Sequence, residues 1–197
     1  MQAFWDNRYS LDGYVYGENP NEFFAQEIQG LTPGKLLLPG EGEGRNAVHA
    51  ARQCWKVWAF DFSNNAHDKA LKLAHHHSVT INYQVISYAD YIPAEAMFDC
   101  LALIYAHITD GNRQLYHQKM LKSLKPGGKL ILEAFSKSQI QNKTGGPQNI
   151  DFLYSKEELA EDFKDLQQLQ ISYHQLELNE GEFHNGKADV IRLTGIK

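Results

Sequence analysis

The sequence has few cysteines, and their positions suit neither a metal site nor a disulfide framework. The two cysteines, Cys54 and Cys100, show no metal-ligand spacing. We expect both to be small, buried hydrophobic side chains. The run His75–His77 predicts no metal site either, because successive helical residues point about 100° apart and do not converge on one ion. The sequence therefore predicts a protein without a metal centre.

Long apolar runs and a basic leader segment are also missing. No apolar run approaches the roughly 18 residues of a membrane-spanning helix, and no basic segment followed by an apolar one opens the chain. The formal net charge of −5 gives no general attraction to nucleic acid or to anionic membranes. We expect a cytoplasmic protein whose partner is a small molecule, with no nucleic acid and no membrane bound. The oligomeric state stays unknown from the sequence.

The composition is typical of a folded globular chain. Hydrophobic residues make up 43% of the 197 residues, and charged residues make up 22%. These proportions are enough for a sizeable core and argue against disorder. The length exceeds a minimal domain and falls short of two, so residues 1–197 are predicted to form a single domain.

A glycine-rich loop is the most informative feature of the chain. Gly40, Gly42 and Gly44 follow the apolar run 35–39 and open a helical pattern. Glycine lets the backbone turn sharply and approach a ligand where any Cβ would intrude. Seventeen residues after Gly44, a second apolar run ends in Asp61, whose carboxylate can hold the two hydroxyls of a ribose. Together these features predict a cradle for a nucleotide cofactor.

The charge of the loop selects among such cofactors. A dinucleotide would place its pyrophosphate at the helix start, where Glu41 and Glu43 add negative charge. S-adenosylmethionine has no phosphate, and its sulfonium and ammonium groups are positive. In addition, Arg45 stands where the dinucleotide pattern has a glycine. The loop therefore favours S-adenosylmethionine over NAD.

Apolar runs alternate with helical patterns over most of the chain. This order is typical of an α/β fold with a mostly parallel sheet and helices on both faces. Ser63 and Asp110 are predicted to cap helices, the second of which reaches Leu124. The strands of the parallel part are predicted at about 35–39, 56–61, 81–87, 98–105 and 129–135.

The last part of the chain has a different character. Residues 136–154 show little periodicity and are predicted to form a long loop over the carboxyl edge of the sheet, where open α/β sheets bind ligands. Ser155 and Glu158 form a capping box at the start of a short helix. Two strand-like runs follow at about 168–178 and 188–196. Their connection is too short for a parallel crossover, so they are predicted to pair antiparallel.

These motifs resemble those of the class I S-adenosylmethionine-dependent methyltransferases. The resemblance rests on Leu-Leu-Pro-Gly-Glu-Gly-Glu-Gly-Arg-Asn at 37–46, on Phe60-Asp61, and on the turn into the fifth strand at 124–132. Residues 4–9 and 181–188 resemble segments of the tellurite-resistance (TehB-like) and thiopurine methyltransferase-like branch. The resemblance implies a Rossmann-like, seven-stranded, mostly parallel sheet with an antiparallel C-terminal strand pair.

The resemblance also implies where the cofactor binds. Asp61 would hold the ribose, Phe62 would pack on the adenine, and residues 1–30 would form a lid or helical segment over the site. The implied cofactor-binding residues are Trp5, Tyr16, Gly40, Glu41, Gly42, Asn46, Asp61, Phe62, Tyr88, Ala89 and Tyr105.

The implied reaction is direct in-line transfer of a methyl group from the sulfonium to a small-molecule acceptor. Tyr105 and His107 are candidates for catalysis, but the sequence shows no convincing base, which favours a soft thiol or metalloid acceptor. Leu38 and Tyr88 stand where the family often has acids, so a non-catalytic S-adenosylmethionine-binding protein is an alternative. A further alternative is an NAD-dependent oxidoreductase, which the acidic glycine-rich loop disfavours.

Overall fold

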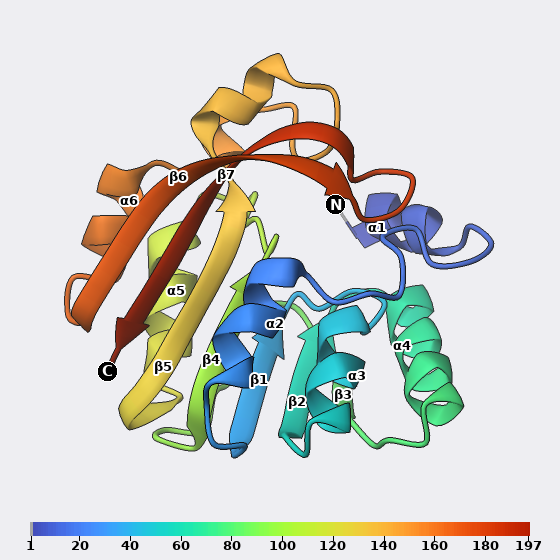
Figure 1. Ribbon diagram of the computed structural model, residues 1–197, viewed down its shortest axis with the longest axis horizontal. Helices are drawn as coiled ribbons and strands as arrows, with labels where there is room; N and C mark the ends of the chain where they lie inside the picture. Colours follow the sequence, from blue (N-terminus) through green and yellow to red (C-terminus); the bar gives the residue numbers. More distant parts are fainter. Residues whose placement is uncertain (1) are drawn as a thin grey trace.

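One sheet of seven strands forms the centre of the molecule. The computed structural model describes residues 2–197 and orders the strands β3-β2-β1-β4-β5-β7-β6 (Figure 1). Strands β1 to β5 pair in parallel, whereas β7 runs antiparallel to β5 and β6. The predicted fold class is confirmed. The strands are β1 (Lys35–Pro39), β2 (Lys56–Asp61), β3 (Asn82–Val85), β4 (Phe98–Ile104), β5 (Leu124–Phe135), β6 (Gln167–Asn179) and β7 (Asn185–Ile196).

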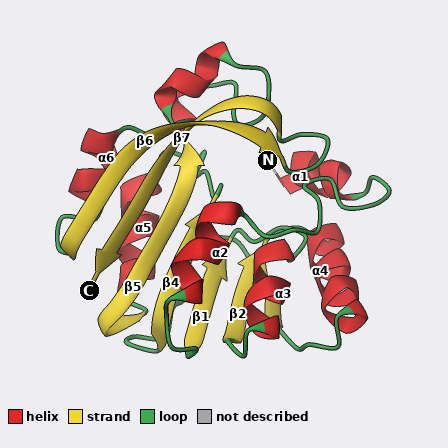
Figure 2. Cartoon of the chain, in the orientation of Figure 1, coloured by secondary structure: helices red, strands yellow, loops and turns green. Residues whose placement is uncertain are grey.

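Helices cover both faces of this sheet (Figure 2). Helices α2, α3 and α4 pack on one face, α5 and α6 pack on the other, and α1 lies beside α4. Within residues 2–197, no helix is long and apolar enough to cross a membrane. The helices are α1 (Gln2–Tyr9), α2 (Glu22–Gln29), α3 (Arg45–Arg52), α4 (Asn64–His76), α5 (Arg113–Leu121) and α6 (Lys156–Asp162), with short 3₁₀ helices η1 (Lys137–Gln141) and η2 (Ile150–Phe152).

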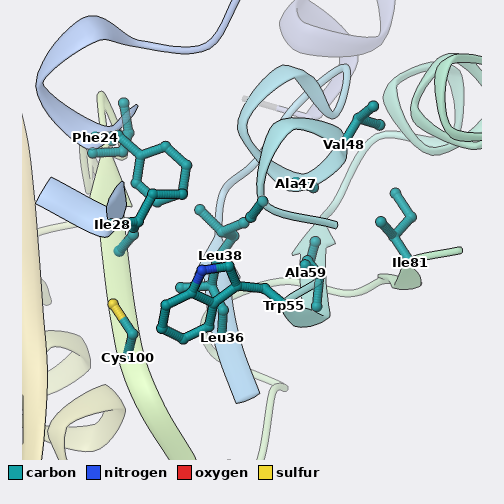
Figure 3. Close-up of a cluster of buried hydrophobic side chains, with 14 of the residues drawn as sticks. Phe24, Ile28, Leu36, Leu38, Ala47, Val48, Trp55, Ala59, Ile81 and Cys100 are labelled. Atoms are coloured by element: carbon teal, nitrogen blue, oxygen red, sulfur yellow. The ribbon is translucent and has the colours of Figure 1, made fainter. Parts of the chain in front are cut away.

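Side-chain alternation along β1 divides the core into two layers. Leu36 and Leu38 pack with Phe24 of α2 and Ala47 of α3 (Figure 3). Leu37, between them, belongs to the opposite layer beneath α5 and α6. The three leucines are at most 1% exposed. Burial on both faces explains the continuous apolar run and fixes the strand that carries the glycine-rich loop.

Two helix starts follow the predicted capping signals. The Ser63 hydroxyl accepts a hydrogen bond from the Ala66 amide at 3.2 Å, where α4 begins. At α6, Ser155 and Glu158 form both hydrogen bonds of a capping box. Each signal lies within four consecutive residues, which is why the sequence alone reveals it.

One predicted helix boundary is wrong. The helix expected from Asp110 begins at Arg113, with Asn112 as its N-cap, and ends at Leu121. Asp110 instead accepts hydrogen bonds from the Asn112 amide at 3.0 Å and from the Tyr116 hydroxyl at 2.9 Å. Its carboxylate therefore closes a local turn that competes with the start of a helix.

The two cysteines differ in environment. Cys100 is fully buried in β4, as predicted. The prediction of a buried Cys54 is wrong, since this residue is exposed. It lies in the tight turn between α3 and β2 with a φ of +68°, outside the strand and helix positions that face the core.

Gly44 should be more sensitive to substitution than its backbone conformation alone requires. A Cβ at this position, whose φ is +90°, would lie 2.7 Å from Ala70 Cβ on α4. Gly44→Ala should therefore add an overpacking cost of about 1–3 kcal/mol to a left-handed penalty of about 1–2 kcal/mol. Gly127→Ala is the matched control, because Gly127 has a φ of +79° and open space around it. Urea denaturation measures both losses, and equal losses would contradict the steric argument.

Candidate functional site

A cavity of about 760 Å³ lies at the carboxyl ends of the parallel strands. Its lining comes from α1 and the turn after it, the glycine-rich loop, the ends of β2 and β4, the loop before η2 and the β6–β7 turn. Ala89 instead lines a separate pocket on α5. The predicted residues that line the cavity are Trp5, Tyr16, Gly40, Glu41, Gly42, Asn46, Asp61, Phe62, Tyr88, Tyr105 and His107.

The glycine-rich loop brings bare backbone to the cavity. The amides of Gly40 and Glu41 both donate to the Phe60 carbonyl, at 2.8 and 3.1 Å, which ties the loop to β2. Gly40 and Gly42 have φ values of +65° and +63°. A Cβ on Gly42 would lie 2.7 Å from the Tyr9 hydroxyl. Glycine is thus required here both by conformation and by space.

Glu41 folds back onto the start of α3. Its carboxylate accepts a hydrogen bond from the Ala47 amide at 2.7 Å and lies 3.5 Å from the Asn46 amide group. Burial raises the pKa of Glu41 to about 7. Within residues 2–197 it forms no ion pair, so a bound cation would stabilise its charged form.

Asp61 is held at the end of β2 by backbone groups. Its Oδ1 accepts a hydrogen bond from the Ser63 amide at 3.0 Å, and the Ser63 hydroxyl donates to Asp6 of α1. Burial raises the pKa of Asp61 to about 6. This carboxylate also lacks an ion-pair partner in the described part of the chain. Two carboxylates without an ion pair in the described residues, Asp61 and Glu41, therefore line the cavity beside the glycine-rich loop.

Glu43 has a different role from Glu41. It accepts hydrogen bonds from the amides of Val15 and Tyr16, at 2.9 and 3.4 Å, and pairs with Lys69 at 2.8 Å. It therefore anchors the turn after α1, and its charge is largely neutralised. Both acids of the loop were predicted to disfavour a phosphate, but Glu43 pairs with Lys69, whereas Glu41 and Asp61 form no ion pair in the described residues.

Tyr88 and Tyr105 shape the cavity between these carboxylates and β4. The Tyr88 hydroxyl is buried without a hydrogen-bond partner in the described residues, and a Cβ on Gly40 would lie 3.1 Å from it. Tyr105 follows β4 with a φ of +50°, a conformation that non-glycine residues rarely adopt. An unsatisfied hydroxyl and a strained backbone are features that cluster at binding sites.

His107 is engaged through both ring nitrogens. Nδ1 lies 2.7 Å from the Phe152 carbonyl, and Nε2 accepts a hydrogen bond from the Phe135 amide at 3.1 Å. Burial lowers the pKa of His107 to about 4. A neutral ring that donates at Nδ1 and accepts at Nε2 has no free nitrogen for a substrate. This geometry argues against His107 as a general base and makes it a structural support.

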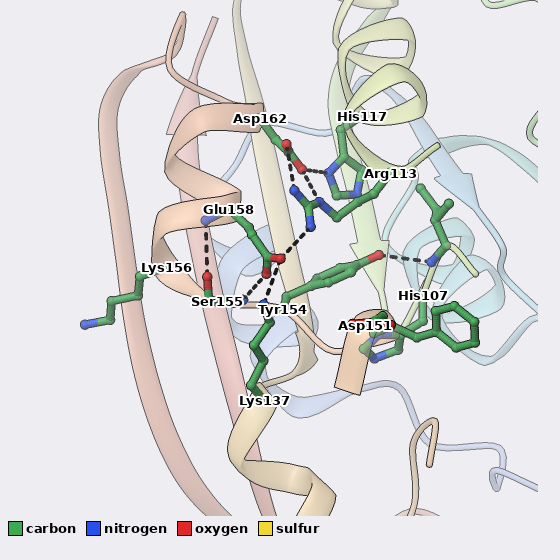
Figure 4. Close-up of polar contacts among 12 residues, drawn as sticks. His107, Arg113, His117, Lys137, Asp151, Tyr154, Ser155, Lys156, Glu158 and Asp162 are labelled. Carbon is green, nitrogen blue, oxygen red and sulfur yellow. Dashed lines mark hydrogen bonds and ion pairs between the residues drawn. The ribbon is translucent and has the colours of Figure 1, made fainter. Parts of the chain in front are cut away.

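Tyr154, whose ring centroid lies 5.0 Å from that of His107, braces the same turn (Figure 4). Its hydroxyl accepts a hydrogen bond from the Ile108 amide at 3.1 Å and donates to the Ala106 carbonyl at 3.2 Å. Tyr154 is fully buried, and Arg113 lies over its ring. The turn that carries Tyr105 into the cavity is therefore fixed by His107 within it and by Tyr154 from a distant part of the chain.

A buried polar network joins the cavity to the rest of the fold. The Asn21 side chain donates to Glu133 at 2.6 Å and lies 3.4 Å from Glu180. Glu180 pairs with Arg45 at 2.9 Å and lies 3.3 Å from Nδ1 of His184. The ion pair between Arg45 and Glu180 was not predicted, because it joins positions far apart in the chain.

Tyr154→Phe should destabilise the protein by about 1–3 kcal/mol. The variant keeps the ring but leaves the buried Ile108 amide and Ala106 carbonyl without a partner. Tyr173→Phe is the control, because its half-exposed hydroxyl accepts a hydrogen bond from the Lys156 amide at an exposed site. Denaturant titration should give a loss within about 0.5 kcal/mol for this control. Similar losses in both variants would contradict a brace at Tyr154.

Comparisons with known proteins agree with this geometry. Residues 37–128 match a family model described as a methyltransferase domain. A probable thiol methyltransferase 2 from Arabidopsis thaliana is 32% identical over 128 residues, which cover 61% of this chain and 54% of that protein. The chain thus spans about half the length of this curated relative.

Solved structures share the fold at low sequence identity. A structure described under the conversion of a disulfide bond into a thioacetal group during echinomycin biosynthesis aligns with a TM-score of 0.76 and 17% identity, covering 100% of this chain and 92% of that one. TehB from Haemophilus influenzae aligns with a TM-score of 0.72 and 15% identity, covering 100% of this chain and 66% of TehB. Residues 37–128 thus match a methyltransferase domain, and the chain resembles the class I S-adenosylmethionine-dependent methyltransferases, including TehB-like proteins, as the sequence predicted.

Proposed function

We propose that this protein transfers a methyl group from S-adenosylmethionine to a small-molecule acceptor, with a soft thiol or metalloid favoured. The observation that carries the proposal is the pair of buried carboxylates, Glu41 and Asp61, beside the glycine-rich loop. They suit a cofactor with positive sulfonium and ammonium groups and a ribose, and they would repel a pyrophosphate.

The residues of the cavity fit this cofactor. Gly40 and Gly42 leave backbone exposed where a side chain would fill the space, and the Tyr88 hydroxyl offers an unused hydrogen-bonding group. Asp61 is placed to accept hydrogen bonds from a ribose. Residues 2–17 cover the cavity through Trp5 and Tyr16, consistent with a lid.

The bound cofactor supplies a methyl group on a positively charged sulfur. The chain's own residues align the acceptor and exclude water, because charge disappears during transfer and water would stabilise the charged ground state. The rings of Tyr105, Phe135 and His184 pack together in the lining of the cavity, with centroids 4.6 to 5.2 Å apart. With His107 occupied by backbone groups, a soft acceptor that needs little base catalysis suits the site. The similarity to a probable thiol methyltransferase supports the same choice.

Calorimetric titration tests the proposal directly. The protein should bind S-adenosylmethionine and S-adenosylhomocysteine in the micromolar range and should not bind NAD. Asp61→Asn should weaken binding at least tenfold, because the amide cannot accept from both ribose hydroxyls as the carboxylate does. Asp68→Asn on the exposed side of α4 is the control and should leave affinity unchanged.

The outcomes separate the alternatives. Binding of NAD alone would contradict the proposed methyltransferase and favour an NAD-dependent oxidoreductase. Binding of S-adenosylmethionine without turnover on any thiol or metalloid acceptor would favour a non-catalytic binding protein. Unchanged affinity in the Asp61→Asn variant would contradict the proposed site.

Affinity for S-adenosylmethionine should depend on pH. Burial raises the pKa of Asp61 to about 6 and of Glu41 to about 7, so both carboxyls are partly protonated in the free protein near neutral pH. A cationic ligand favours their charged forms, so binding should release protons and strengthen from about pH 5.5 to 7.5. Titrations in buffers of different ionisation enthalpy measure the proton release. A flat affinity over this range would contradict the assigned carboxylates.

A further inference from the structure

Arg8 on α1 is a cation held in the cavity by aromatic rings. Its guanidinium carbon lies 3.8 Å from the Phe183 ring centroid and 4.9 Å from that of Phe4. Its Nη1 donates to the Tyr16 hydroxyl at 3.1 Å. These contacts orient the side chain without consuming most of its five N–H donors.

Arg8 lacks the acidic partner that Arg45 and Lys69 have. Arg45 pairs with Glu180 at 2.9 Å, and Lys69 pairs with Glu43 at 2.8 Å. In residues 2–197, Arg8 forms no ion pair, although it is only partly exposed. Its charge and its remaining donors are therefore available to a ligand.

The lining of the cavity carries charges of both signs. Glu41 and Asp61 lie beside the glycine-rich loop, where the cofactor is proposed to bind. Arg8 lines the same cavity and contacts Tyr16, whose ring is 4.5 Å from that of His184, which in turn is 4.6 Å from Tyr105. A negative group bound at Arg8 would thus share the cavity with a positive sulfonium.

We propose that Arg8 is a specificity-determining residue that binds the negative charge of the acceptor, a small aromatic thiol that carries a carboxylate. This inference rests on the proposed methyl transfer. A guanidinium matches a carboxylate with two parallel hydrogen bonds, and the rings around Arg8 suit an aromatic body. The acceptor sulfur, as thiolate, forms the new bond to the methyl carbon. The bond from that carbon to the sulfonium breaks, and its electron pair stays on the donor sulfur.

The test compares a carboxylate with its uncharged methyl ester. Isothermal titration of the complex with S-adenosylhomocysteine uses 4-(methylthio)benzoate and its methyl ester, which need no turnover. The wild-type complex should bind the carboxylate at least tenfold more tightly than the ester. Arg8→Gln should remove this preference and leave ester binding within threefold, and Arg8→Lys should retain part of it. Arg52→Gln, an exposed arginine at the end of α3, is the charge-matched control.

Turnover gives a second readout with 4-mercaptobenzoate and its methyl ester as acceptors. Arg8→Gln should raise KM for the carboxylate at least tenfold and change kcat for the ester less than threefold. Equal binding of both ligands by the wild type, absent binding of the carboxylate, or a preserved preference in Arg8→Gln would overturn the role of Arg8. Failure of S-adenosylhomocysteine to bind the wild type would instead overturn the proposed function on which the inference rests.

Discussion

One buried carboxylate, Glu133, joins the parts that form the site. It is fully buried in β5 and accepts hydrogen bonds from Asn21 at 2.6 Å and from Arg192 of β7 at 2.5 Å. The backbone amide of Asn21 in turn donates to Oδ1 of Asn46, beside the glycine-rich loop, at 2.9 Å. A buried charge is stable only while all its partners are in place. Three segments therefore depend on one another: strand β7, the chain before α2 and the glycine-rich loop.

Features of the site that depend on near neighbours in sequence were predictable. The apolar run of Leu36 to Leu38, the glycine spacing after it and the cap at Ser63 all lie within a few residues, and local geometry determines what they form. Features that depend on packing between distant segments were not. The neutralisation of Glu43 by Lys69 and the two backbone bonds of His107 join residues that only the folded sheet brings together.

Two buried carboxyl groups make the cavity electrostatically unfavourable. Burial raises the pKa values of Asp61 and Glu41, and neither forms an ion pair in the described residues. A group whose pKa is raised on folding makes the folded state less stable as pH rises from its unfolded to its folded pKa. A positive ligand favours the charged carboxylates, so its binding would restore the folding free energy that their burial costs in the free protein. Such sites favour affinity at the expense of stability.

Ser63 makes three contacts, two through its hydroxyl group and one through its backbone amide. Its hydroxyl caps α4 and donates to Asp6 of α1, while its amide holds Asp61. If Asp61 binds the cofactor as proposed, these contacts would link that ligand to the position of α1, and by thermodynamic linkage each would favour the other by the same factor. The consequence would be kinetic as well as structural: ligand departure and movement of α1 would become one cooperative event, and the lifetime of the complex would depend on a residue outside the reacting centre.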